Sequence, residues 1–240
     1  MKNIIKKSFV CVFAALATLV ASAFDTPYLT FRSASSFSLR TGNMMKNWDG
    51  TIEYSTDAEN WTVWSGTTTL TASQSGGEYF LYLRGTNNTK ITGSSSSNNK
   101  WTFPTGNNIY CEGDIETLRG YDGNAPGMVS QCYRYMFYGC SALASAPILS
   151  ATALTERCYD SMFKDCTGLT APPELPATTL ALYCYYGMFN GCTSLKSLPE
   201  LPATTLVSYC YWDMFNGCSS LEVNLSGAGV PWSLPSGINT

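Results

Sequence analysis

Cysteine is the residue with the widest chemical repertoire in this sequence, because a thiol can bind a metal, exchange disulfides or pack as a small apolar group. The segment CYYGMFNGC begins at Cys184, and three similar segments, CYRYMFYGC, CYDSMFKDC and CYWDMFNGC, begin at Cys132, Cys158 and Cys210. Successive copies start 26 residues apart. Four copies in register identify a repeat, so one explanation of the cysteines must serve all of them.

The spacing of the two cysteines in each copy argues against a metal site. Structural zinc sites usually draw thiolates from closely spaced pairs such as C-x2-C, whereas seven residues separate the cysteines here. If a straight helix joins them, eight residues rise about 12 Å. That distance is too great for one metal ion and for a C-x-x-C redox centre, so we predict no metal and no other cofactor.

Disulfide bonds are a separate question, which the sequence leaves open. A bond within one repeat requires a sharp bend, for instance at Gly191 or Gly217, whereas a bond between neighbouring coils would join equivalent residues about 4.8 Å apart. The alternative is a row of reduced cysteines packed as apolar side chains. Cys111 lies outside the repeats and makes the number of cysteines after residue 23 odd. At least one thiol is therefore expected to be free or intermolecular.

Catalysis would have to depend on other groups. The chain has no histidine, which excludes Ser-His-Asp and Cys-His machinery and histidine-ligated metals. The densest group of carboxylates could be considered as a glycosidase pair, but it lies in and beside a predicted hairpin, where acidic residues ordinarily serve the turn. This group comprises Asp49, Glu53, Asp57 and Glu59. We predict that the protein is not an enzyme.

Positions beside the repeated cysteines are the first candidates for binding. The tyrosine that follows each first cysteine is constant, and we expect it to pack between coils. The next position differs in every copy, as expected where a uniform scaffold displays different side chains to a partner. We predict that its occupants are exposed and bind a ligand; they are Arg134, Asp160, Tyr186 and Trp212.

Tryptophans of the first half of the chain offer an alternative binding surface. Aromatic rings can form a platform on which sugars stack, and four tryptophans are available for one: Trp48, Trp61, Trp64 and Trp101. A buried tryptophan in a β-sandwich would explain one or two of them equally well.

The repeat that must position these side chains has a period of its own. Apolar residues follow one another at four-residue steps, which predicts one face of a short helix; in one copy they are Leu154, Cys158, Met162 and Cys166. A glycine before the second cysteine suits the left-handed residue that ends a helix. The prolines of the following segment, such as TAPPELPATTL, favour an extended arc.

Such units bury their apolar faces only by stacking on one another. Residues 167–192 and 193–218 are identical at 18 of 26 positions, and residues 141–166 follow the same pattern more loosely. We therefore predict a short solenoid over residues 113–225. Residues 226–240 are expected to cap its last coil through Trp232 and Leu234, or to trail from it.

Residues 24–112 have a different, strand-like character. Alternating apolar and polar residues occur in IEYSTDAENWTVWS, which reads as a hairpin, and in EYFLYLRGT. Further short strands are expected at PYLTFRS, SFSLRT, TTTLTA, KWTFPT and NIYCEG. Short strands separated by turns rich in Gly, Ser and Asn predict a β-sandwich of immunoglobulin-like size.

The first 23 residues resemble a secretory signal peptide. A basic start is followed by the apolar run FVCVFAALATLVA and by Ala21-Ser22-Ala23, a pattern that signal peptidase accepts. Cleavage would remove three of the 14 basic residues and none of the 17 acidic residues, leaving a formal charge of −6. We predict export without membrane insertion after cleavage, and no nucleic-acid partner.

The pattern CYxxMFxGCTSLxxxPELPATTL resembles the BspA-like leucine-rich repeats of bacterial surface and secreted proteins, over roughly residues 120–225. The preceding domain looks like the immunoglobulin-like module found ahead of such repeats. The resemblance implies an immunoglobulin-like β-sandwich followed by a short α/β leucine-rich-repeat solenoid of 26-residue repeats. It also implies adhesion or protein–protein interaction, with an unknown protein or glycan at the cell exterior as partner. Carbohydrate binding by the aromatic residues of the first domain is the competing hypothesis, and self-association into a surface layer is a third.

Overall fold

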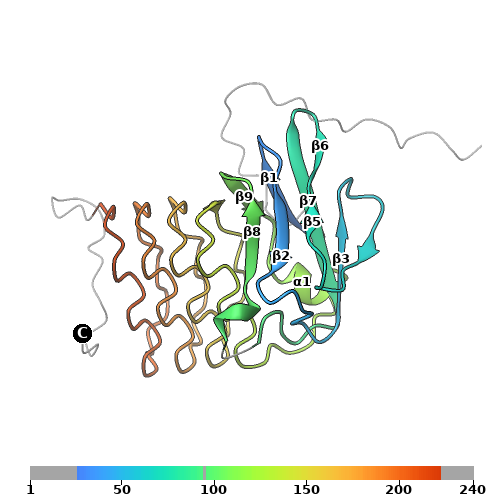
Figure 1. Ribbon diagram of the computed structural model, residues 1–240. Coiled ribbons are helices and arrows are strands. Elements are labelled where there is room, and N and C mark those ends of the chain that lie inside the picture. Colours follow the sequence, from blue (N-terminus) through green and yellow to red (C-terminus); the bar gives the residue numbers. More distant parts are fainter. Residues whose placement is uncertain (1–25, 94–95, 223–240) are drawn as a thin grey trace, which may run out of the picture.

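A computed structural model describes residues 26–93 and 96–222 of the chain (Figure 1). Two strand-rich sheets lie at one end of a row of stacked coils. The elements in chain order are β1 (Leu29–Ser33), β2 (Ser38–Thr41), β3 (Thr51–Ser55), β4 (Thr62–Val63), β5 (Leu70–Thr71), β6 (Ser73–Ser75), β7 (Glu78–Thr86), the 3-10 helix η1 (Ser97–Asn99), β8 (Trp101–Thr105), β9 (Ile109–Glu112), α1 (Thr117–Gly120) and β10 (Leu143–Ser145).

The strands form a large and a small sheet. The larger has the order β10-β9-β1-β7-β3-β4, with β6 also paired to β7, and the smaller has the order β5-β2-β8. The prediction of a strand-rich fold is confirmed. The expected hairpin is β3 and β4, where Glu53 lies opposite Val63. The segment EYFLYLRGT is β7, which places Leu81 and Leu83 in the core.

The coil stack, residues 131–222, contains the four cysteine segments. Within each of the first three segments the backbone alternates two kinds of hydrogen bond. Every second N–H donates to the next coil, as from Tyr133 to the Cys158 carbonyl at 2.9 Å, and the N–H groups between them close turns three residues back, as from Met136 to Tyr133 at 3.1 Å. The strictly alternating pattern satisfies the backbone and ties each coil to the next.

The predicted helix in each repeat is wrong. Every fourth residue of a segment has a positive φ, for example Tyr183 at 57°, Gly187 at 54° and Gly191 at 76°. A left-handed residue at this interval interrupts any right-handed helix and replaces it by consecutive turns. The four-residue step was thus a true period of four rather than a helical period of 3.6. The expected left-handed glycine before the second cysteine is confirmed at Gly191 and Gly217.

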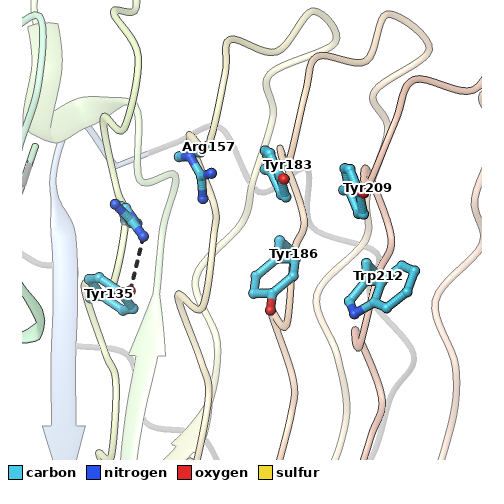
Figure 2. A pocket seen from close by; sticks show the side chains of 7 residues that line it. Tyr135, Arg157, Tyr183, Tyr186, Tyr209 and Trp212 are labelled. Carbon is cyan, nitrogen blue, oxygen red and sulfur yellow. Dashed lines mark hydrogen bonds between the residues drawn. The ribbon is translucent and has the colours of Figure 1, made fainter. Parts of the chain in front are cut away.

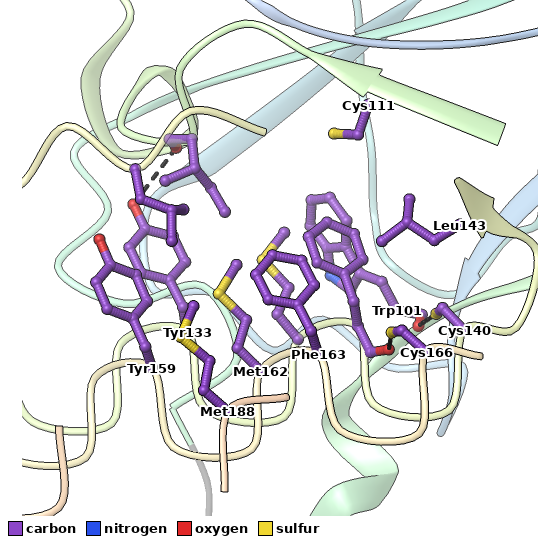
Figure 3. Close-up of a cluster of buried hydrophobic side chains, with 14 of the residues drawn as sticks. Trp101, Cys111, Tyr133, Cys140, Leu143, Tyr159, Met162, Phe163, Cys166 and Met188 are labelled. Carbon is purple, nitrogen blue, oxygen red and sulfur yellow. Dashed lines mark hydrogen bonds between the residues drawn. The ribbon is translucent and has the colours of Figure 1, made fainter. Parts of the chain in front are cut away.

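The hydrophobic core runs without a break from the sheets into the coil stack (Figure 3). β10, which belongs to the first repeat, pairs in parallel with β9. Phe137 of the first coil contacts Phe31 and Trp101, with ring centroids 6.2 and 6.4 Å away. The predicted boundary at residues 112 and 113 therefore falls inside a shared core.

The predicted signal peptide, residues 1–23, and the predicted cap, residues 226–240 with Trp232 and Leu234, lie outside the described residues. Within the described part of the chain, no helix has the length and apolar character needed to cross a membrane.

Candidate binding groove on the coil stack

An open groove of about 550 Å³ lies along one side of the coil stack (Figure 2). Its side chains come from all four cysteine segments. They are Arg134, Tyr135, Arg157, Tyr183, Tyr186, Tyr209 and Trp212. Aromatic rings and guanidinium groups thus make up the whole lining.

The period of four explains why these residues face outward. In the third segment, for example, Cys184 and Tyr185 are buried while Tyr183 and Tyr186 flank them nearer the surface. Equivalent residues of successive coils then form rows. The first row, the residue before each first cysteine, holds Gln131, Arg157, Tyr183 and Tyr209; the second row, two residues after that cysteine, holds Arg134, Asp160, Tyr186 and Trp212.

The first row forms a continuous stack of planar groups. The Arg157 guanidinium carbon lies 3.9 Å from the centroid of the Tyr183 ring. The Tyr183 and Tyr209 rings are 4.7 Å apart and nearly parallel, at 4°. Arg157 and Tyr209 thus stack against the faces of the Tyr183 ring. Tyr183 therefore presents its ring edge and its hydroxyl to the groove.

The second row meets the first at an angle. The Tyr183 and Tyr186 rings are 5.6 Å apart at 72°, and those of Tyr209 and Trp212 are 5.4 Å apart at 59°. Figure 2 shows Arg157, Tyr183 and Tyr209 in one row and Tyr186 and Trp212 in the other. Each of the last two coils therefore contributes a V-shaped pair of rings.

The prediction that Asp160 is exposed is wrong. Its side chain is 1% exposed and lies beneath the groove. Arg134 Nε and Arg157 Nη1 lie 2.9 and 3.0 Å from its Oδ2, and the Ser161 hydroxyl donates to its Oδ1 at 2.8 Å. A carboxylate this deeply buried requires such partners, so Asp160 fixes the two arginines and does not meet a ligand.

The other three predicted site residues, Arg134, Tyr186 and Trp212, line the groove together. Trp212 is the most accessible of them, with 42% of its surface exposed. Sequence reasoning missed Tyr135 and the first-row residues Arg157, Tyr183 and Tyr209. A signal for the first row was present, because the residue before each first cysteine also changes between copies.

The constant tyrosines pack between coils, as predicted. Tyr133, Tyr159 and Tyr185 are at most 1% exposed, and their rings stack at centroid distances of 5.6 and 5.8 Å. Burial raises the pKa of each hydroxyl well above its ordinary value. These rings form part of the core and do not contact the groove.

The proposed tryptophan platform of the first domain is wrong for three of its four members. Trp48, Trp64 and Trp101 are at most 4% exposed and contact one another at 4.9 and 5.5 Å between ring centroids. They fill the core where sugars cannot reach. Trp61 is only partly buried, and the Arg84 guanidinium covers one face of its ring at 4.1 Å.

The acidic cluster serves the local backbone and nearby cations. Glu53 pairs with Arg84 at 2.7 Å. Asp57 accepts hydrogen bonds from the Glu59 and Asn60 N–H groups at 2.9 and 2.8 Å, and the bonds from Asn60 contribute most to lowering its pKa. Asp49 accepts from the Thr89 N–H at 2.9 Å. Asp57 thus serves a turn, as expected from its sequence context, whereas Glu53 pairs across two strands and Asp49 binds a distant loop.

All nine cysteines of the described residues are free and buried, so packing is the alternative that the structure adopts. The second thiol of each segment also donates to a backbone carbonyl, in the preceding coil or, for the first segment, in β8. Cys166 and Cys192 each donate to a phenylalanine carbonyl, of Phe137 and Phe163, at 3.0 Å, and Cys140 donates to the Trp101 carbonyl at 3.1 Å. Within the described ranges no group of three potential ligands could hold a metal ion.

Searches against protein-family models, curated proteins and solved structures find no match to this chain. The function of the groove must therefore be inferred from its own geometry.

Proposed function

We propose that this chain is a secreted or cell-surface module for adhesion or protein–protein interaction, without catalysis, and that the groove on the coil stack is its contact surface. In this proposal the first part is an immunoglobulin-like β-sandwich and the coil stack is a short solenoid of BspA-like leucine-rich repeats. The unknown partner lies at the cell exterior, consistent with the signal-like start of the sequence.

The observation that carries the proposal is the composition of the groove. Its seven lining residues are all tyrosine, tryptophan or arginine, the three residue types most enriched at the energetic centres of protein interfaces. Buried contacts hold the arginines in place, so little side-chain freedom is lost when a partner binds.

The orientation of the rings favours a protein over a sugar as partner. Sugars stack on the flat faces of aromatic rings, but the contacts between Arg157, Tyr183 and Tyr209 use those faces within the stack. In the first row, the ring edge and hydroxyl of Tyr183 therefore remain for the partner, beside the rings of Tyr186 and Trp212 in the second row. Such groups match the mixed polar and apolar surface of a polypeptide.

Binding of the purified chain to a panel of extracellular matrix and serum proteins tests this proposal. The variant Tyr186→Ser/Trp212→Ser should weaken each interaction at least 10-fold, because two anchors of the groove are removed. Val63→Ser is the matched control, since Val63 is 63% exposed but lies on β4, outside the groove. Equal affinities of the double variant and the unchanged protein would contradict the proposal.

A further inference from the structure

Every polar group that lines the groove can donate a hydrogen bond, although the tyrosine hydroxyls can also accept one. A guanidinium and an indole N–H can only donate. Within residues 26–93 and 96–222, the hydroxyls of Tyr183, Tyr186 and Tyr209 make no hydrogen bond. Partial burial, and then the charges of Asp213 and Asp160, raise the pKa of Tyr186, which keeps its hydroxyl protonated. A ligand that only accepts hydrogen bonds could therefore pair with each of these three hydroxyls and with the Trp212 N–H.

The charges of the groove do not call for an ionic ligand. The guanidiniums of Arg134 and Arg157 share the buried carboxylate of Asp160. Glu156 provides a second, half-exposed carboxylate 3.6 Å from Arg157 Nε, and Asp213 is exposed beside Trp212. Since the positive charges are already balanced, an acidic partner gains no net attraction, and acceptor groups without charge fit better.

The spacing of the rows suggests the shape of the ligand. Neighbouring coils lie about 4.8 Å apart, so two coils advance about 10 Å. A polyproline II helix advances about 9.3 Å in one turn of three residues. One turn of such a helix would thus span the stack from Arg157 through Tyr183 to Tyr209, with ring-lined notches on the last two coils.

We propose that the groove binds a proline-rich segment of a partner protein in the polyproline II conformation. Proline has no N–H to leave unpaired against a donor-rich surface, and the polyproline II backbone leaves its carbonyls free to accept. Aromatic-lined grooves recognise such segments in other proteins through the same physics. This inference rests on the proposed function and names the chemistry of its partner.

Titration of the full chain with labelled 12-residue peptides tests the inference by fluorescence anisotropy. One peptide is all proline, and the other is a glycine–serine peptide of the same length. The proline peptide should bind at least 10-fold more tightly. Tyr209→Phe should weaken that binding about 5-fold, because it removes one donor and leaves the ring in place, and Trp212→Ser should weaken it further.

A control separates lost contact from lost structure. Tyr110→Phe removes an exposed tyrosine hydroxyl on β9, away from the groove, and should leave peptide binding unchanged. The melting temperature of Tyr209→Phe should equal that of the unchanged chain. A shared loss of binding in both variants would overturn the inference.

Other outcomes distinguish this inference from the function on which it rests. Equal binding of both peptides would overturn the polyproline proposal. Binding of proline-free proteins that depends on Trp212 would also overturn it while supporting the proposed function. Tighter binding of a peptide of residues 223–240, or self-association lost in Trp212→Ser, would identify the chain's own tail or a second copy as occupant, again against the inference. Absence of any groove-dependent binding would contradict both.

Discussion

Asp160 illustrates how one residue in a repeated row can change the role of its neighbours. Its equivalents Arg134, Tyr186 and Trp212 line the groove, whereas Asp160 turns inward and holds two guanidiniums. The arginines can lie flat beside aromatic rings because the buried carboxylate of Asp160 balances their charge.

We expect Asp160→Asn to destabilise the fold by about 3 kcal/mol, because two largely buried guanidiniums would lose their charged partner. Urea unfolding monitored by circular dichroism measures this change. Asp213→Asn is the matched control, since Asp213 is exposed one row away, and its effect should stay within about 0.5 kcal/mol. Similar losses in the two variants would show that the buried pairs are unimportant.

The buried thiols make a second prediction at the level of single residues. Burial raises the pKa of Cys140, Cys184 and Cys192 to about 12 in each case. An unfolded thiol ionises near pH 8.5. Between about pH 9 and 12, the unfolded chain has therefore released protons that the folded chain retains. The free energy of unfolding should fall as pH rises through this window, by about 1 kcal/mol per pH unit for each such thiol.

Urea unfolding under reducing conditions at pH 7, 9 and 10 checks this expectation. The decline between pH 9 and 10 should be smaller in Cys184→Ala, which lacks one of these thiols. Ionisation of the buried tyrosines in the unfolded chain also lowers the free energy of unfolding, but only from about pH 10 upward. A free energy of unfolding that stays constant from pH 7 to pH 10 would rule out the raised thiol pKa values.

At the scale of the element, the backbone of the cysteine segment is the main departure from the sequence prediction. A spacing of four residues fits a helix over one or two turns, so the pattern of Cys158, Met162 and Cys166 could not reject one. The left-handed residue at every fourth position distinguishes these turns from a helix. This position is occupied by glycine in some places and by aspartate, serine, glutamine, arginine or tyrosine in others. Because tyrosine and arginine rarely adopt a positive φ, the sequence does not reveal that every fourth residue is left-handed.

Reciprocal substitutions at one position of the segment test this backbone. Gly187 and Asp213 are equivalent residues with φ of 54° in successive coils. Gly187→Ala should destabilise the fold by about 1 kcal/mol through its left-handed backbone, although the nearest atom to an added Cβ is Ser161 Oγ at 3.5 Å.

Asp213→Gly should leave the free energy of unfolding within about 0.5 kcal/mol, because glycine relieves the backbone but gains freedom in the unfolded chain. Chemical denaturation of both variants provides the comparison. If Gly187→Ala instead stabilised the fold, residue 187 would have a right-handed backbone, and the predicted helix would be the better description of the segment.

Other elements followed from the sequence more directly. Alternation of apolar and polar residues located β3, β4 and β7, because the period of a strand is independent of its tertiary partners. Three of four predicted groove residues were found because they vary on a repeated scaffold. Burial of Asp160 depends on arginines from its own coil and the preceding one. Burial of Trp48 depends on distant strands. The residues next to each in the sequence predict neither contact.

At the scale of the whole molecule, the sheets act as the first layer of the coil stack. The Ile91 and Trp101 N–H groups donate to the Cys132 and Met136 carbonyls at 2.9 and 2.7 Å, as each coil does to the next. The Trp101 carbonyl receives the Cys140 thiol just as phenylalanine carbonyls do further along. A stack of repeats needs such a cap to protect its first coil.

We therefore expect Trp101→Ala to weaken both parts of the chain together, by about 4 kcal/mol. Hydrogen exchange followed by mass spectrometry should show faster exchange in peptides that contain Tyr133 and Phe137 as well as in β8. Trp61→Ala, at a partly exposed tryptophan that contacts Arg84 of β7, should change exchange near β4 and β7 but not in the coil stack. If the faster exchange in Trp101→Ala were confined to the sheets, the coil stack would be stable without this cap.

The alternating hydrogen bonds between coils have a consequence for how this surface can grow. Any two neighbouring segments are joined by the same donors and acceptors, so a duplicated unit of 26 residues could be spliced between two others without new chemistry at either junction. Each duplication would add one residue to each row of the groove and leave the cap untouched. Copy number would then set the reach of the binding surface, while point changes within the two rows would set what it recognises.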